Sequence, residues 1–138
     1  KILCPFGIDE QYGHSIIKFE LDQTNDKHIE IISQIRDFES KLKEQFYTDD
    51  EEWKSLINIR ENNNIFIEAR IKKIKNNLLT KLTFDDKEQN YLKTIYELNK
   101  NFVSDIILEI PTLWDFRKEE KNLNKIGLLL NLYSIHVY

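Results

Sequence analysis

Apolar and polar side chains alternate one by one through residues 65–71, and this period of two narrows the possible folds more than any other feature. The segment IFIEARI places apolar residues at odd positions and Phe66, Glu68 and Arg70 at even ones. Such alternation predicts a strand with one buried face and one face in solvent. Similar runs occur at 14–21 and 102–110, so the chain is expected to be mostly β.

A local excess of positive charge follows that strand. Residues 70–81 contain five cations and no acid, although the chain has a formal net charge of -4. Cations beside aromatic side chains on a strand suit a groove for a phosphate backbone. A charged strand face in solvent has the same pattern, so both interpretations stay open. These cations are Arg70, Lys72, Lys73, Lys75 and Lys81.

Other segments have the spacing of helices. Apolar residues three and four positions apart predict a helix over 25–46, with Asn25 or Asp26 as its N-cap. Similar spacing predicts a second helix over 85–99. Strands are predicted at 14–21, 53–60, 65–74, 78–84, 102–110 and 126–137.

Short strands, polar turns and one or two inserted helices predict a small antiparallel barrel of the oligonucleotide-binding (OB) type. The lack of regular strand–helix alternation argues against a doubly wound sheet. A chain of 138 residues without repeats or low-complexity linkers fits one domain, so a single OB-fold-like nucleic-acid-binding domain is expected over 1–138.

Composition excludes several classes of protein. A hydrophobic content of 41% is too high for a disordered tail. No apolar run approaches the length of a membrane span, and no signal segment begins the chain. The single Cys4 cannot form an internal disulfide, which favours a reducing intracellular compartment. The lack of Met, even at position 1, indicates a fragment or a processed chain.

The sequence offers little for catalysis, so an enzyme is not expected. The three histidines lie far apart, and one Cys cannot build a structural zinc site. Three glycines are too few for a phosphate-cradling loop, and no cofactor is expected. Acid pairs at helix ends most often serve the helix dipole or solvation. The carboxylates that a metal-dependent nuclease would use are Asp49, Asp50 and Asp85.

Several aromatic residues can stack on bases or pack in a core. Trp53 begins a predicted strand and suits either role. Trp114, flanked by apolar residues, favours the core. Phe66 shares a strand face with Arg70, which makes stacking an equal alternative. Tyr133 is expected to project outward from the last strand.

The order of elements resembles the OB-fold single-stranded-DNA-binding proteins of T-odd podophages and nucleocytoplasmic large DNA viruses. The resemblance begins with PFGI at 5–8 and continues with the Trp-led strand WKSLI at 53–57. It is most specific near the end, at LW (113–114), KIGL (125–128) and IHV (135–137). It covers nearly the whole chain.

This resemblance implies sequence-tolerant binding of single-stranded DNA in replication, repair and recombination. The expected location is then a host cytoplasm or a viral replication site, and replication proteins are possible partners. Such proteins recruit partners through an acidic C-terminal tail, whereas the residues here end at Tyr138 without one. The net negative charge is no objection, because binding requires only a local positive groove.

Single-stranded DNA binding is therefore the leading hypothesis. The alternative is a non-catalytic interaction or scaffold module, which would include a homodimer formed through a strand edge or the 25–46 helix. A metal-dependent nuclease is the third hypothesis. The residues predicted to bind nucleic acid are Lys54, Arg60, Phe66, Arg70, Lys72, Lys73, Lys75, Lys81 and Tyr133.

Overall fold

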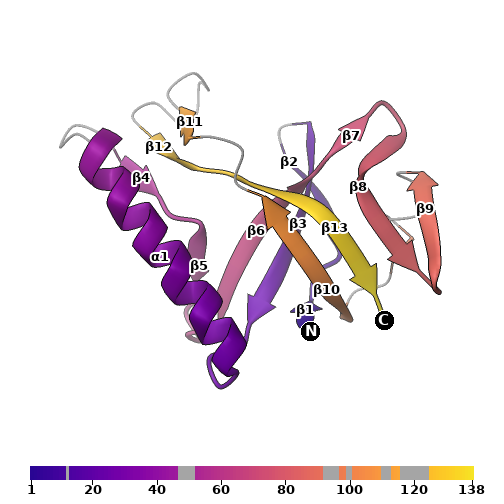
Figure 1. Ribbon diagram of the computed structural model, residues 1–138, viewed down its shortest axis with the longest axis horizontal. Helices are drawn as coiled ribbons and strands as arrows, with labels where there is room; N and C mark the ends of the chain where they lie inside the picture. The colour runs from indigo at the N-terminus through magenta and orange to yellow at the C-terminus, as the bar shows by residue number, and fades with distance from the viewer. Residues whose placement is uncertain (12, 47–51, 92–96, 99–100, 110–112, 116–124) are drawn as a thin grey trace.

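The computed structural model describes residues 1–11, 13–46, 52–91, 97–98, 101–109, 113–115 and 125–138. Within these ranges most elements are strands, and one long helix, α1 (Asp26–Phe46), lies beside them (Figure 1). The strands are β1 (Ile2–Cys4), β2 (Ile8–Gln11), β3 (His14–Leu21), β4 (Glu52–Lys54), β5 (Ile57–Ile59), β6 (Ile65–Ile71), β7 (Lys73–Ile74), β8 (Asn77–Phe84), β9 (Lys87–Tyr91), β10 (Phe102–Glu109), β11 (Leu113–Asp115), β12 (Lys125–Leu128) and β13 (Leu130–Val137).

Five of these strands close into a barrel. β1 pairs with β3, β3 with β6, β6 with β13, β13 with β10, and β10 returns to β1. Only the pairing of β6 with β13 is parallel among these. The strand order is that of a small Greek-key barrel of the OB type. The predicted fold class, a mostly β barrel with a helix inserted, is therefore confirmed.

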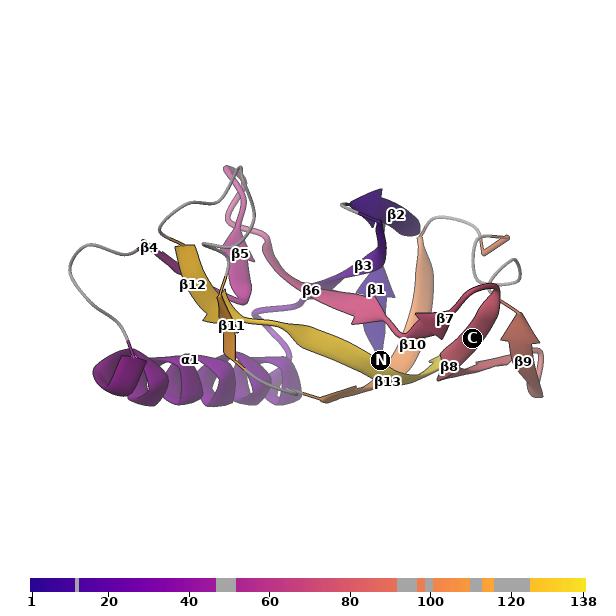
Figure 2. The same ribbon diagram turned by 90° about the horizontal axis from the view of Figure 1, so that it is seen from above.

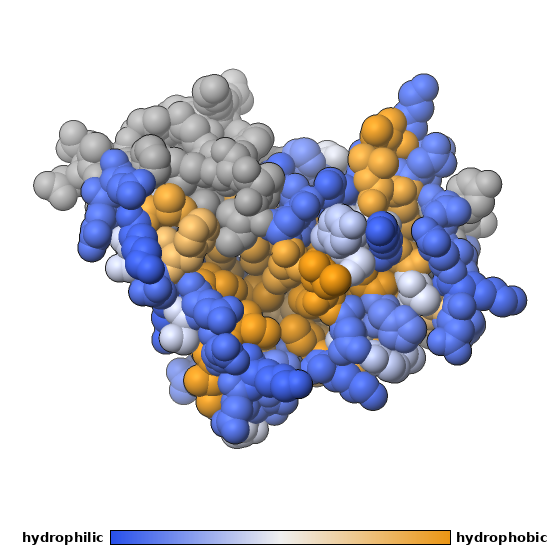
Figure 3. All heavy atoms as spheres, viewed as in Figure 1, coloured by the Kyte–Doolittle hydropathy of each residue, from blue (hydrophilic) through white to orange (hydrophobic). Residues whose placement is uncertain are grey.

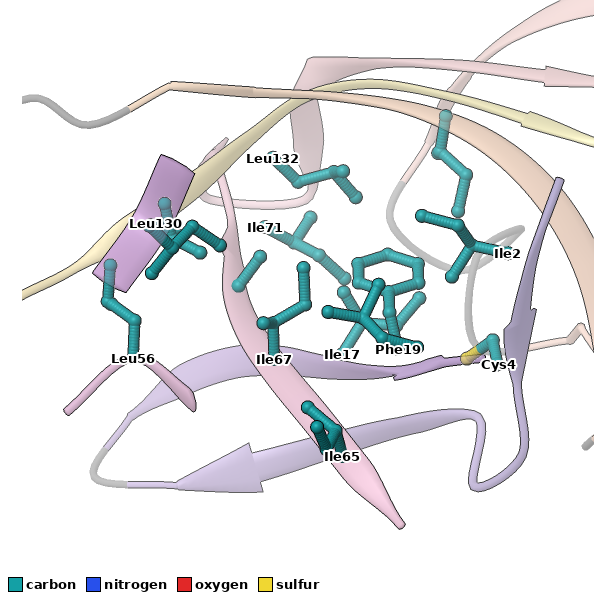
Figure 4. Packing of buried hydrophobic residues seen from close by; sticks show 14 of the residues in the cluster. Ile2, Cys4, Ile17, Phe19, Leu56, Ile65, Ile67, Ile71, Leu130 and Leu132 are labelled. Atoms are coloured by element: carbon teal, nitrogen blue, oxygen red, sulfur yellow. The ribbon is translucent and has the colours of Figure 1, made fainter. Parts of the chain in front are cut away.

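Alternation along β3 and β6 explains why the barrel closes around an apolar interior. Phe19 of β3 and Ile67 of β6 face each other across the strand pair, and both are fully buried. Figure 4 shows them beside Leu132 of β13 within one apolar cluster. Branched and aromatic side chains of this kind pack well on a pleated surface. The predicted inward face of residues 65–71 is confirmed.

β13 changes its neighbour along its length. Its first residues pair with β6 and its last residues with β8, in parallel in both cases. The buried Thr80 of β8 stands where the neighbour changes. Its hydroxyl donates to Leu132 O at 2.6 Å and accepts from the Lys72 N–H at 2.9 Å. This hydroxyl connects β8 and β13 to Lys72, the residue between β6 and β7, where the predicted strand 65–74 is divided.

The helix predicted over 25–46 is confirmed as α1. Asn25 is its N-cap, because its Oδ1 accepts from the N–H groups of Lys27 and His28 at 3.0 and 3.3 Å. Ile32 and Ile35 are buried on its inner face. Figure 2 shows α1 to one side of the barrel, near β4 and β5.

A buried carboxylate connects α1 to the next segment of the chain. Glu39 is 5% exposed and accepts from Trp53 Nε1 at 2.5 Å, and from Ser55 Oγ and Leu56 N at 3.0 Å each. The Leu56 N–H therefore donates to Glu39 and cannot donate to a neighbouring strand. The strand predicted over 53–60 consequently divides into β4 and β5.

The helix predicted over 85–99 is wrong where the structure describes it. Residues 87–91 form β9, which pairs with β8 as a hairpin. Asp85 and Asp86 connect the two strands with φ of 51° and 56°, the positive values that a tight hairpin turn needs. This turn overrides the helical spacing of the apolar residues. Residues 92–96 and 99 lie outside the described ranges.

Removing the Glu39 carboxylate tests the connection between α1 and β5. We expect Glu39→Ala to lower the free energy of unfolding by about 3 kcal/mol, because each buried donor left unpaired costs about 1–3 kcal/mol. Urea unfolding measures the change. Glu44→Ala, at an exposed position of the same helix, is the control and should cost less than about 0.5 kcal/mol. Equal losses in the two variants would contradict this role of Glu39.

Burial of Cys4 predicts a loss of stability at high pH. Desolvation raises the pKa of its thiol from 9.0 to about 11. Because the folded state favours the protonated thiol, Cys4 contributes fully to the free energy of unfolding below pH 9.0. This contribution is lost as the pH rises through about 11. The difference in unfolding free energy between the wild type and Cys4→Ala should shrink across that window. A difference independent of pH would contradict the prediction.

Candidate nucleic-acid interface

The predicted binding residues do not gather in one place. Lys54, Arg60 and Phe66 line one cleft on the outside of the barrel. The remaining predicted residues do not line that cleft and are found elsewhere on the surface. These are Arg70, Lys72, Lys73, Lys75, Lys81 and Tyr133.

The cleft has a volume of about 720 Å³ and lies between β5 and the outer faces of β3 and β6. Its lining is polar and contains both signs of charge. The cations are Lys18, Lys54 and Arg60, the acids are Glu61 and Glu68, and the amides are Asn58 and Asn62.

The charges of the cleft are unevenly distributed. Lys18 and Glu68 are opposite each other across β3 and β6, and their charged atoms are 3.8 Å apart. This half-buried pair balances its own charge on the strand surface. Lys54 and Arg60 are the other cations of the lining, and Glu61 is its other acid.

Two phenylalanine rings and a guanidinium form a compact group at the cleft. The ring centroids of Phe6 and Phe66 are 5.6 Å apart. The Arg60 guanidinium carbon lies 5.4 Å from the Phe6 centroid and 5.3 Å from the Phe66 centroid. A cation within about 6 Å of an aromatic ring is attracted by the negative face of the ring. The rings therefore hold Arg60 at the cleft.

Local backbone geometry places these side chains. Gly7 has a φ of 70°, which allows the turn after Pro5 that brings Phe6 over β6. Arg60 begins the turn between β5 and β6, where its carbonyl accepts from the Asn63 N–H at 2.8 Å. Asn63 has a φ of 63°, which asparagine tolerates better than most residues.

Phe6 is the binding candidate that sequence reasoning missed. Phe66 was predicted on the outer strand face and lies there, but Phe6 and Arg60 lie beside it and it is only 5% exposed. Phe6 is 46% exposed and offers the accessible ring. Its place in a Pro–Phe–Gly turn was the available signal, because such turns bring side chains to the surface.

Three cations at the end of β6 and just after it, Arg70, Lys72 and Lys73, each contact a residue far away in the sequence. Arg70 Nη1 is 3.3 Å from His14 Nε2. Lys72 Nζ is 2.7 Å from Glu109 Oε1, and Lys73 Nζ is 3.3 Å from Glu10 Oε1. The structure thus directs these side chains to three different neighbours.

Lys81 and Tyr133 form a separate group on the outer side of β8 and β13. Lys81 Nζ lies 5.2 Å from the Tyr133 ring centroid, and Tyr133 is 41% exposed as predicted. The register between β10 and β13 shifts beside Ile107, and Tyr133 is the extra residue of the bulge. Bulges re-aim side chains in this way. Lys75 is exposed at the turn between β7 and β8, with a φ of 55°.

Trp53 has a structural role. Trp53 is half-buried and donates to Glu39, so it anchors β4 to α1. Lys43 Nζ lies 5.8 Å from its ring centroid. Trp114 belongs to β11, and its side chain lies outside what the structure describes.

Potential catalytic groups are scattered. Among the described residues, no group of three or more His, Cys, Asp or Glu side chains is arranged to hold a metal ion. His28 is buried, accepts from the Asp22 N–H at 2.9 Å through Nδ1, and places Nε2 3.1 Å from Lys1 O. Asp85 lies in the exposed turn before β9, whereas Asp49 and Asp50 lie outside the described ranges.

Comparison of this chain with protein-family models, with curated proteins and with solved structures found no match. Where the structure is described, it contains no helix with both the length and the apolar character needed to cross a membrane.

Proposed function

We propose that this protein binds single-stranded DNA without strong sequence preference and acts in DNA replication, repair and recombination. The observation that carries the proposal is a cleft outside β3 and β6 that Lys54 and Arg60 line, with the Phe6 ring beside the Arg60 guanidinium. In barrels of the OB type, the face formed by the second and third barrel strands is where oligonucleotides bind. β3 and β6 are those two strands in this chain.

The chemistry of the cleft fits a single strand. The cations Lys54 and Arg60 contact phosphates, and the exposed face of Phe6 receives a base. A stacked base contributes about 1–3 kcal/mol whatever its identity, which accounts for tolerance of sequence. Asn58 and Asn62 offer amide groups to base edges or sugars along the same cleft.

The acids of the cleft set a limit on this binding. Glu61 and Glu68 repel phosphates that approach them, so the strand is expected to pass on the side of Lys54 and Arg60. The path then runs across β5 toward Phe6. This predicts a short site, because few phosphates are neutralised.

The second candidate function is a protein-interaction module. Exposed apolar residues on β8, β10 and β13, away from the cleft, favour it. Ile107, Tyr133 and Leu79 are exposed by 58%, 41% and 52% on β10, β13 and β8. Exposed apolar side chains gathered on neighbouring strands are typical of protein contacts. Light scattering decides this point: a homodimer disrupted by Ile107→Lys would support the module.

Fluorescence anisotropy of labelled oligo(dT) at rising salt concentration tests DNA binding. We expect affinity to fall with salt, and the slope of log K against log salt to lose about 0.7 for each phosphate contact removed by Lys54→Ala or Arg60→Ala. Lys41→Ala, at an exposed position of α1, is the matched control and should leave the slope unchanged. Absent or salt-independent binding would refute the proposal.

Phe6→Ala tests the stacking contact separately from charge. We expect it to weaken binding by about 1–3 kcal/mol at every salt concentration while the salt slope stays constant. Thermal unfolding should confirm that the variant is folded, since Phe6 is 46% exposed. A changed slope with unchanged affinity would contradict a stacking role. Lys72→Ala should affect binding less than Lys54→Ala, because Lys54 lines the cleft and Lys72 does not.

A further inference from the structure

A second hollow lies between α1 and the barrel, and its volume is about 620 Å³. We name it the helix–barrel cavity. Side chains of α1, β1, β10 and β13 line it, and Figure 3 shows apolar residues in the depression beside the helix. Binding sites for small molecules commonly measure about 300–1,000 Å³ and are mostly apolar.

The lining changes in character along the helix. Toward the middle of α1 it is apolar, with Ile35 and Phe38 facing Ile106 and Leu108 of β10 across the cavity. Phe38 is 42% exposed although it carries no polar group. Leaving such surface in water is unfavourable by about 25 cal/mol per Å², so an apolar occupant would be stabilised there.

The other end of the cavity is polar and lies near the N-terminus of α1. Lys1 and Lys27 bring positive charge to it, Asp105 brings negative charge, and His28 adds a polar ring whose Nδ1 accepts from the Asp22 N–H. The Asp105 carboxylate accepts from the Tyr138 hydroxyl and lies 3.4 Å from the Lys1 α-amino nitrogen, so Lys27 carries the cation of this end that Asp105 does not pair with. Exposed Lys27 forms no ion pair with any residue that the structure describes. An anionic group is favoured at this end, since the helix N-terminus also attracts negative charge.

Ser104 independently indicates that this cavity suits a ligand with a hydrogen-bonding group. It lines the polar end, lies on the same face of β10 as Ile106, and is fully buried. Its Oγ has no hydrogen-bond partner among the described residues. A buried hydroxyl without a partner costs about 1–3 kcal/mol, which an incoming acceptor would recover.

We propose that the helix–barrel cavity binds a monomeric fatty acid, with its alkyl chain along Ile35, Phe38 and Leu108 and its carboxylate between Lys27 and Ser104. The polar end and the apolar length of the cavity match the two parts of such a molecule. This proposal does not depend on DNA binding, because the cleft and the cavity share only Leu130 among their lining residues.

Isothermal titration of the whole chain with dodecanoate below its micelle concentration tests the proposal. We expect one molecule bound per chain, and about tenfold weaker binding of decanoate, because each buried methylene contributes about 0.8 kcal/mol. Dodecyltrimethylammonium has the same tail and the opposite charge, and should bind more weakly. Equal binding of the two, or no saturable binding of dodecanoate, would overturn the proposal.

Variants separate the two ends of the cavity. Lys27→Glu should weaken dodecanoate binding about fivefold to tenfold, whereas Lys41→Glu on the same helix should leave it unchanged. Leu108→Trp should block the alkyl chain. If Leu108→Trp fails to fold, methyl NMR of the wild type still tests where dodecanoate binds. Signals of Ile106 and Leu108 should shift on binding, and those of Ile74 and Leu79, exposed by 59% and 52%, should not.

Uniform shifts at all four methyl-bearing residues would indicate adsorption to exposed apolar surface and would refute a specific site. Binding to anionic phospholipid vesicles without binding of the monomer would also refute it. DNA affinity measured in parallel distinguishes the two proposals, because Lys27→Glu alters no residue of the cleft.

Discussion

The parallel pairing of β6 with β13 is the constraint on which the rest of the structure depends. It closes the barrel between segments more than fifty residues apart in the chain, and Leu130 to Leu132 supply the paired residues of β13. Without this pairing, β3 and β6 would form an open sheet with one apolar face in water. The hydroxyl of Thr80 secures the junction by bonding to both Leu132 and Lys72. A closed barrel also leaves fewer open edges for aggregation.

The closure of the barrel also determines the positions of the cleft and of the helix–barrel cavity. Leu130 lines both the cleft outside β3 and β6 and the helix–barrel cavity. It is 3% exposed, so its side chain forms part of the wall that separates them. Glu39 holds the opposite boundary by fixing Ser55 and Leu56, which line the cleft, against α1. A change at Leu130 would therefore reshape both hollows, whereas Lys54 and Lys27 each belong to one.

The sequence allowed prediction of features determined by neighbouring residues. The alternation at 65–71 predicted β6, and the spacing over 25–46 predicted α1, because each pattern reports directly on one buried face. β9 was missed because two consecutive residues with positive φ, Asp85 and Asp86, outweighed apolar spacing. By contrast, the positions of the Lys72 and Lys73 side chains depend on acidic partners that are distant in the sequence. Glu109 lies 37 residues from Lys72, and Glu10 lies 63 residues from Lys73.

Those distant partners draw apart cations that are clustered in the sequence. Exposed ion pairs contribute about 0–1 kcal/mol, so a phosphate can separate Lys72 from Glu109 at little direct cost. The separated carboxylate stays nearby, however, and its repulsion of the phosphate offsets most of what the lysine offers. Arg60 differs because its neighbours are the rings of Phe6 and Phe66, which carry no net charge. In a chain with a formal net charge of -4, the partner of each cation therefore matters more than the number of cations.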